Sequence, residues 1–101
     1  MNINVHSIHF DADIKLVEFI KEKIQKLNQF HDNILAADVF LRLEHDGENR
    51  ENKLVEVRLN VPGRELFAKR QGKSFEEATA NTTEALRSQV ERTKEKLRNA
   101  S

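Results

Sequence analysis

The sequence predicts an α+β domain in which a four-stranded, mostly antiparallel sheet carries two helices on one face. Three consecutive segments, within residues 36–45, 53–61 and 64–71, alternate apolar and polar residues as half-buried strands do. Two longer segments, 12–29 and 74–98, repeat their apolar residues at helical spacing. With an alternating segment at the start, the predicted order is strand, helix, three strands, helix, in a single domain spanning residues 1–101.

The first strand covers residues 2–10, with Ile3 and Val5 pointing to one side. Asp11 is a suitable N-cap for the first helix, and Asp13 adds negative charge to its first turn. The apolar stripe of this helix is formed by Leu16, Val17, Ile20, Ile24 and Leu27. A helical crossover of this kind predicts that the first strand pairs in parallel with the second.

The second and third strands each turn one apolar face inward and are joined by a polar loop with an Asp46-Gly47 turn signal. Pro62-Gly63 predicts a tight turn into the fourth strand, either of whose faces is compatible with burial. Ser74 and Glu77 form a capping box for the second helix. Its inward stripe comprises Phe75, Ala78, Thr82, Leu86, Val90, Thr93 and Leu97.

Composition favours a soluble globular domain, because hydrophobic residues make up 38% of the chain and charged residues 34%. There is no cysteine, which excludes disulfides and cysteine-bound metals. No apolar run approaches the roughly 20 residues of a membrane span, and the start of the chain lacks the pattern of a signal peptide. We therefore expect a cytoplasmic protein without a membrane partner.

The sequence contains no arrangement that predicts catalysis. Its three glycines are scattered, and no serine lies in a nucleophile-elbow context. His6 and His9 are three apart in a strand and face opposite ways, while His31 and His45 lie in loops, so ordinary polar histidines are favoured over a metal site. We expect no catalytic residue, metal, cofactor or small-molecule substrate.

The basic residues of the second helix fall on the two flanks of its apolar stripe. A helical projection places Arg92 and Lys96 on one flank and Arg87 and Lys94 on the other, with an acidic ridge between them. Lys23 and Lys26 of the first helix lie on one flank, next to two phenylalanines. We predict that Arg92 and Lys96 face these lysines across a cationic groove suited to phosphates. Charge is added just before the second helix by Lys69, Arg70 and Lys73.

The alternative for these flanks is a solvated surface. Lysine and arginine stems commonly cover the apolar edges of a helix stripe while their charged ends stay in water.

Nearly the whole chain also resembles a known family, the short-form ribosome hibernation-promoting factors. This family is related to the ribosome-associated inhibitor and has been described as sigma-54 modulation proteins. The matching segments are "FDADIKLVEFIKEKIQKLNQFHDNILAADVFLRLE", "ENKLVEVRLNVPGRELFAKRQGKSFEEA" and "ALRSQVERTKEKL", in family order.

The resemblance implies a fold similar to double-stranded-RNA-binding domains and a translation inhibitor active in stationary phase or stress. Its partner would be the small ribosomal subunit, bound through 16S rRNA at the decoding region so that messenger and tRNA are blocked. A helper protein for ribosome dimerisation is a further partner that the resemblance suggests. Long-form members carry a further C-terminal domain that pairs ribosomes, and none is expected in this 101-residue chain.

The family's basic positions match the chain at four residues, which are the expected RNA contacts: Lys23, Lys26, Arg92 and Lys96. Auxiliary RNA contacts are assigned to Lys69, Arg70, Lys73, Arg87 and Lys94. Gln29, Ala85 and Ser88 stand where many members carry lysine or arginine, so the groove is less charged than in those relatives.

A second hypothesis assigns the protein to a different class. The sheet face away from the helices would carry Phe40, Arg42 and Arg58, and it could act as a protein-interaction module in self-association or with a transcription component.

Overall fold

The computed structural model describes residues 1–31, 33–44 and 51–99, with side chains described as far as Thr93. The predicted Asp46-Gly47 turn lies outside the described residues. The element order agrees with the expected one. It is β1 (Asn2–Ser7), α1 (Ile14–Gln25), the 3-10 turn η1 (Lys26–Gln29), β2 (Ala36–Leu43), β3 (Lys53–Val61), β4 (Arg64–Gly72) and α2 (Phe75–Asn99).

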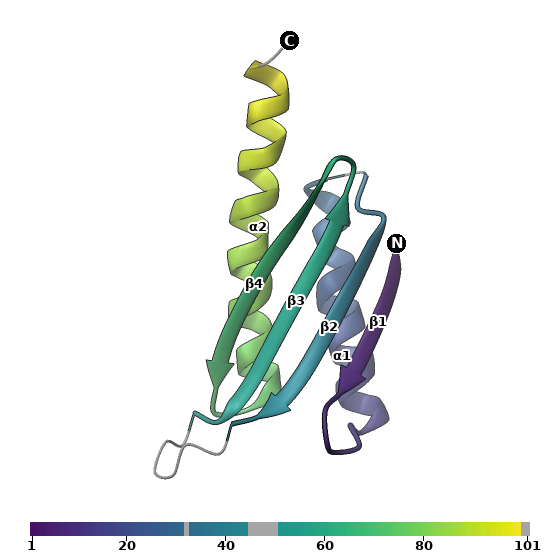
Figure 1. The fold of residues 1–101 in the computed structure, drawn as a ribbon, viewed down its shortest axis with the longest axis vertical. Helices are drawn as coiled ribbons and strands as arrows, with labels where there is room; N and C mark the ends of the chain where they lie inside the picture. Colours follow the sequence, from purple (N-terminus) through teal and green to yellow (C-terminus); the bar gives the residue numbers. More distant parts are fainter. Residues whose placement is uncertain (32, 45–50, 100–101) are drawn as a thin grey trace.

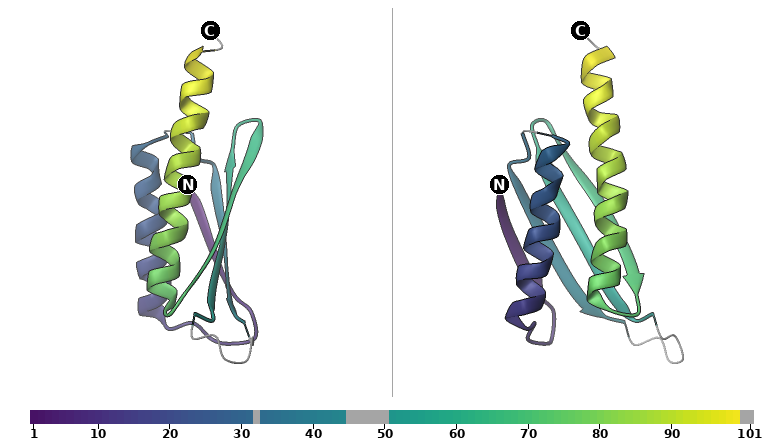
Figure 2. Two further views of the ribbon diagram at one scale, coloured as in Figure 1. Left: turned by 90° about the vertical axis from the view of Figure 1, so that its left-hand side faces the viewer. Right: turned by 180° about the vertical axis from the view of Figure 1, so that it is seen from behind.

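The four strands form one sheet in the order β1-β2-β3-β4. β1 pairs with β2 in parallel, and the other two pairings are antiparallel, which confirms the predicted topology. Both helices cover the same face of the sheet, and the last turns of α2 extend beyond the β3–β4 hairpin (Figures 1 and 2). Among the described residues, no helix or strand covers the opposite face of the sheet (Figure 2).

The core lies between the sheet and the two helices. Val39, Val57 and Leu59 alternate inward from the central strands and are fully buried, as are Ile20 of α1 and Leu86 of α2. Burying a side chain of this size contributes about 1.5–3 kcal/mol, so the sheet–helix layer supplies most of the stability. The two faces of β4, left open by the sequence, are also distinguished: Leu66 and Ala68 face the helices and are buried.

The start of α1 differs from the prediction. Asp13, and not Asp11, is the N-cap: its side chain accepts a hydrogen bond from the backbone N–H of Lys15 at 3.2 Å. The carbonyl of Asp13 also accepts from Val17 N–H, the first bond of the helical ladder. The first helical residue is therefore Ile14, because the later aspartate satisfies a backbone donor that would otherwise be free.

α2 begins with the predicted pair of Ser74 and Glu77, in close contact with the end of β4, but the glutamate bonds one residue earlier than in a standard capping box. Ser74 Oγ accepts from Glu77 N–H, and Glu77 Oε2 accepts from Lys73 N–H, both at 3.0 Å. A Cβ atom on Gly72 would lie 2.9 Å from the backbone nitrogen of Ala78. Glycine is thus required at this position so that the first turn of the helix can lie against the strand.

The outer edge of β4 has side chains bonded to its backbone. Val61 and Arg64 flank the two-residue turn as partners in the ladder, so the carbonyls of Phe67 and Lys69 point away from β3. Gln89 Nε2 donates to Phe67 O at 2.7 Å, and Arg70 Nη1 donates to Lys69 O at the same distance. The first of these bonds fixes α2 against the strand.

Candidate nucleic-acid interface

A shallow groove of about 260 Å³ separates the end of the first helical segment from α2. Lys23 lies in the last turn of α1, and Lys26 begins the 3-10 turn that follows it. Tightening of the helix at this point brings Phe30 back toward α2, with its N–H bonded to the carbonyl of Leu27. The lining residues are Lys23, Lys26, Leu27, Phe30, Thr83, Glu84 and Arg87.

Two cations of this groove form cation–π contacts with aromatic rings. The guanidinium of Arg87 lies 4.6 Å from the centroid of the Phe30 ring, and Lys23 Nζ lies 5.5 Å from that of Phe19. Arg87 Nε also contacts Glu91 Oε1 at 3.3 Å. Cation–π contacts of this kind contribute about 0.5–1 kcal/mol at exposed sites and hold the charged group in place. The groove therefore presents positive charge beside an apolar floor.

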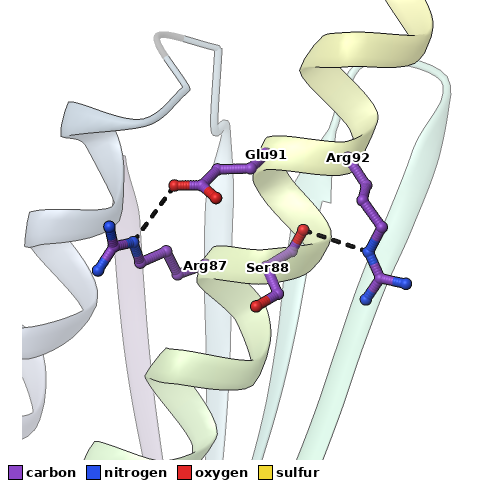
Figure 3. Close-up of polar contacts among 4 residues, drawn as sticks. All are labelled: Arg87, Ser88, Glu91 and Arg92. Carbon is purple, nitrogen blue, oxygen red and sulfur yellow. Dashed lines mark hydrogen bonds and ion pairs between the residues drawn. The ribbon is translucent and has the colours of Figure 1, made fainter.

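The prediction that Arg92 and Lys96 face the first helix is wrong for Arg92. Arg87 points toward α1, whereas Arg92 points to the opposite side of α2, toward the β3–β4 hairpin (Figure 3). Arg92 lines a second hollow with Arg64 and Leu66 of β4. Lys96 lies in the same helix, and its side chain is outside the described part of the chain.

The two flanks were separated correctly by the helical projection but assigned to the wrong neighbours. Projection gives the angle between residues on one helix, and it carries no information on which element lies beside each flank. Which element lies beside each flank depends on the direction of α2 across the sheet and on the sheet face that the helix covers. Arg87, placed on the far flank by the sequence, is thus the α2 cation of the groove.

Of the auxiliary cations, Arg87 lines this groove, whereas Lys69, Arg70 and Lys73 are not among its lining residues. Lys69 is the register partner of Glu56, on the sheet face away from the helices. Arg70 is bonded to the Lys69 carbonyl, and Lys73 lies in the exposed connection before α2. Lys94 belongs to α2, and its side chain is not among those described. The sequence missed Arg64, whose only signal was its position after the Pro62-Gly63 turn.

The uncovered face of the sheet carries a line of stacked side chains. His6 stacks on Phe40 with ring centroids 4.9 Å apart. The Arg58 guanidinium lies 5.5 Å from the Phe40 ring and 6.0 Å from that of Phe67, which is 44% exposed. His6 Nε2 also lies 3.6 Å from Asp38 Oδ1. Phe40 and Arg58, two of the three residues predicted for this face, are therefore in contact, and Phe67 joins them as an exposed apolar member. Among the described side chains, Arg42 forms no cation–π contact with these rings.

The described residues contain no group of three metal-binding side chains. His6 lies in β1 and stacks on Phe40, and His9 follows the strand with a positive φ of 65°. His31 accepts a hydrogen bond from Asn33 N–H through Nδ1. Within the same described ranges, no helix is both long enough and apolar enough to cross a membrane.

The fold and this surface define a small α+β domain that carries a cationic groove between two helices on one side of a mixed sheet. Residues 3–98 match the family model described as "Sigma 54 modulation protein / S30EA ribosomal protein". Because the match spans nearly the whole sequence, the chain belongs to this family. No curated protein matches the sequence.

Solved structures confirm the fold. A ribosomal subunit interface protein from Coxiella burnetii is 18% identical in sequence and superposes with a TM-score of 0.81, covering 93% of this chain and 98% of its own. The N-terminal domain of Thermus thermophilus Protein Y is 21% identical with a TM-score of 0.78, covering 92% and 99%. Identities this low establish shared architecture, and the residues of the site must be argued from this chain.

Proposed function

We propose that this protein binds the small ribosomal subunit at the decoding region and silences it by occupying the path of messenger and tRNA. Family membership and a fold shared with a ribosomal subunit interface protein support the proposal. The observation that carries it is the groove in which Lys23, Lys26 and Arg87 lie beside Phe30. Such a surface suits RNA backbone, because cations neutralise phosphates while an aromatic floor excludes water.

The mechanism requires occupancy and no covalent chemistry. Lys23 and Lys26 contact 16S rRNA phosphates from the first helical segment, and Arg87 contacts them from α2. Arg92 and Lys96 of α2 remain proposed RNA contacts, with the side chain of Arg92 on the side of the helix away from the groove. The site of action is the cytoplasm, where the ribosomes are.

Co-sedimentation with purified small subunits over a salt series tests the proposal. The wild type is expected to bind at low salt and to weaken as salt rises, with a slope of about −0.7 to −0.9 for each phosphate contact. Absence of binding to small subunits at low salt would contradict the proposal.

A matched pair of charge reversals locates the contact. Lys23→Glu is expected to weaken binding and to reduce the salt slope by about 1. Lys21→Glu makes the same charge change two residues away, on the flank of α1 that lies beside Met1 and Ile3. It should bind as the wild type does. Equal losses for the two variants would show that only net charge matters and that the groove is not the contact.

The stacked cluster on the uncovered sheet face favours a second candidate function, a protein-interaction module. An arginine held between two phenylalanines, one of them 44% exposed, is typical of residues that dominate protein interfaces. Phe67→Asp should abolish such an interaction and leave small-subunit binding unchanged. Loss of small-subunit binding in Phe67→Asp, with folding intact, would instead place the ribosome contact on this face.

A further inference from the structure

A second hollow lies on the flank of α2 away from α1. It measures about 330 Å³ and lies between the start of β4 and the second half of the helix. We refer to it as the β4 notch. It is lined by Arg64, Leu66, Gln89, Arg92 and Thr93.

The notch is built from fixed parts. The Pro62-Gly63 turn, with Gly63 at a φ of 81°, starts β4 at Arg64. Strand alternation then places Arg64 on the same face as the buried Leu66, so this arginine is directed to the side of the sheet that α2 covers. The β3–β4 hairpin thus places Arg64 beside α2, a helix that is distant from it in sequence.

The helical side of the notch is also held in place. Gln89 donates from Nε2 to the carbonyl of Phe67 at 2.7 Å. Thr93 is buried, and its hydroxyl donates to the carbonyl of Gln89 at 2.9 Å. The spacing between strand and helix is therefore set by bonds that do not involve either arginine.

The two guanidinium groups of the notch have no acidic partner among the described side chains. No carboxylate is among its lining residues, and neither Arg64 nor Arg92 forms an ion pair within the described part of the chain. Among the described side chains, Arg92 donates one hydrogen bond, from Nε to Ser88 O of its own helix at 3.4 Å (Figure 3). The ends of that guanidinium remain available. Arg87, by contrast, is engaged with both Glu91 and Phe30.

We propose that the β4 notch binds an RNA backbone phosphate through Arg64 and Arg92. Guanidinium groups present paired donors that match phosphate oxygens, and such bonds between charged groups are the stronger class. This inference rests on the proposed function. It implies that α2 lies between two backbone segments, one in the α1–α2 groove and one in the notch.

RNA is favoured over an acidic peptide as the ligand of the notch. The notch and the groove lie on opposite flanks of one helix, and the two cationic surfaces on that helix suit a ligand that carries charge along its length. RNA is also the ligand proposed for the groove on the opposite flank, so one ligand would account for both surfaces.

The test is a double-mutant cycle read as small-subunit affinity over a salt series. Arg64→Gln and Arg92→Gln should each weaken binding by about threefold to tenfold and reduce the salt slope by about 1. Because both arginines hold one phosphate, the double variant should lose less than the product of the two single losses. For the variant that combines Arg64→Gln with Lys23→Glu in the groove, the loss of affinity should instead equal the product of the two single losses.

Several outcomes overturn the inference, and they differ from failure of the proposed function. If the wild type binds small subunits and Arg64→Gln binds with unchanged affinity and salt slope, RNA binding in the notch is refuted and RNA binding in the groove is not affected. If the wild type does not bind, the proposed function and the notch fail together. If Arg64→Gln reduces binding only to polyglutamate, used as an acidic-peptide probe, the RNA assignment is wrong. Urea unfolding of each variant excludes loss of folding as the cause.

Discussion

The two flanks of α2 carry similar residues in different circumstances. On the α1 side, Arg87 stacks on Phe30 at 4.6 Å and pairs with Glu91 at 3.3 Å. On the β4 side, Arg92 has only a long bond to Ser88 of its own helix, and Arg64 has no ion pair in the described part of the chain. A cation with protein partners also contributes to the stability of the fold, whereas a cation without them contributes only to ligand binding. Counting charges along the helix does not distinguish these roles.

The largest expected effect concerns how α2 is set against β4. Gly72→Ala would place a Cβ atom 2.9 Å from the backbone of Ala78, so the helix or strand must shift. We expect a loss of about 2–3 kcal/mol in the free energy of unfolding, measured in urea. Gly63→Ala is the control: nothing lies within 4 Å of its Cβ, and only the positive φ costs about 1 kcal/mol. A larger loss at Gly63 would contradict the importance of this close approach.

A smaller effect is expected from the bond that holds α2 to the strand at the notch. Gln89→Ala removes the donor to Phe67 O and should lower the free energy of unfolding by about 1 kcal/mol. Ser88→Ala, at the exposed preceding position, is the control and should change it by less than about 0.5 kcal/mol. Equal effects in urea unfolding would mean that the hydrogen bond contributes nothing to this flank.

The two arginines themselves should differ in their contribution to stability. Arg87→Gln is expected to cost about 0.5–1 kcal/mol, because the contact with Phe30 and an exposed ion pair are both lost. Arg92→Gln should leave the free energy of unfolding unchanged within about 0.3 kcal/mol. The same urea titration measures both variants. A reversed order would show that the notch arginine is the structural one.

The smallest expected effect isolates the ion pair on the groove flank. Glu91→Gln should cost about 0.2–0.5 kcal/mol, a value limited by the exposure of both side chains. The loss should vanish in 1 M salt, where the Debye length falls to about 3 Å. Glu84→Gln, on the same helix, serves as the control. A loss that persists in high salt would point to packing rather than charge.

Much of the fold could be predicted because its pattern is local. Alternation in β2 and β3 identified the inward row that includes Val39 and Val57, although Leu54 is buried outside that row. The spacing of Ile20 and Ile24 identified the inner face of α1. The start of α1 was placed two residues early, since Asp11 and Asp13 both suit an N-cap and only the three-dimensional bond to Lys15 decides between them. β4 was ambiguous because Phe67, on its uncovered face, is apolar.

The candidate site could be predicted only in part. Lys23 and Lys26 are near in sequence and turn to one side together, so their grouping was evident from the helix alone. Arg64 and Arg92 come from separate elements, and no sequence period links them. The same limit explains why the flank that carries Arg87 was assigned to the wrong neighbouring element. Pairings between elements depend on tertiary packing, which the spacing of residues along one helix does not encode.

The side chains bonded to the carbonyls of Phe67 and Lys69 have a consequence for how this protein behaves at high concentration. An exposed edge strand is a template on which other chains can add strands and begin to aggregate. Here an incoming strand would have to displace Gln89 and Arg70, at a loss of about 1 kcal/mol for each hydrogen bond. The β4 edge of the sheet is therefore protected against fibril growth by the same contact that positions α2.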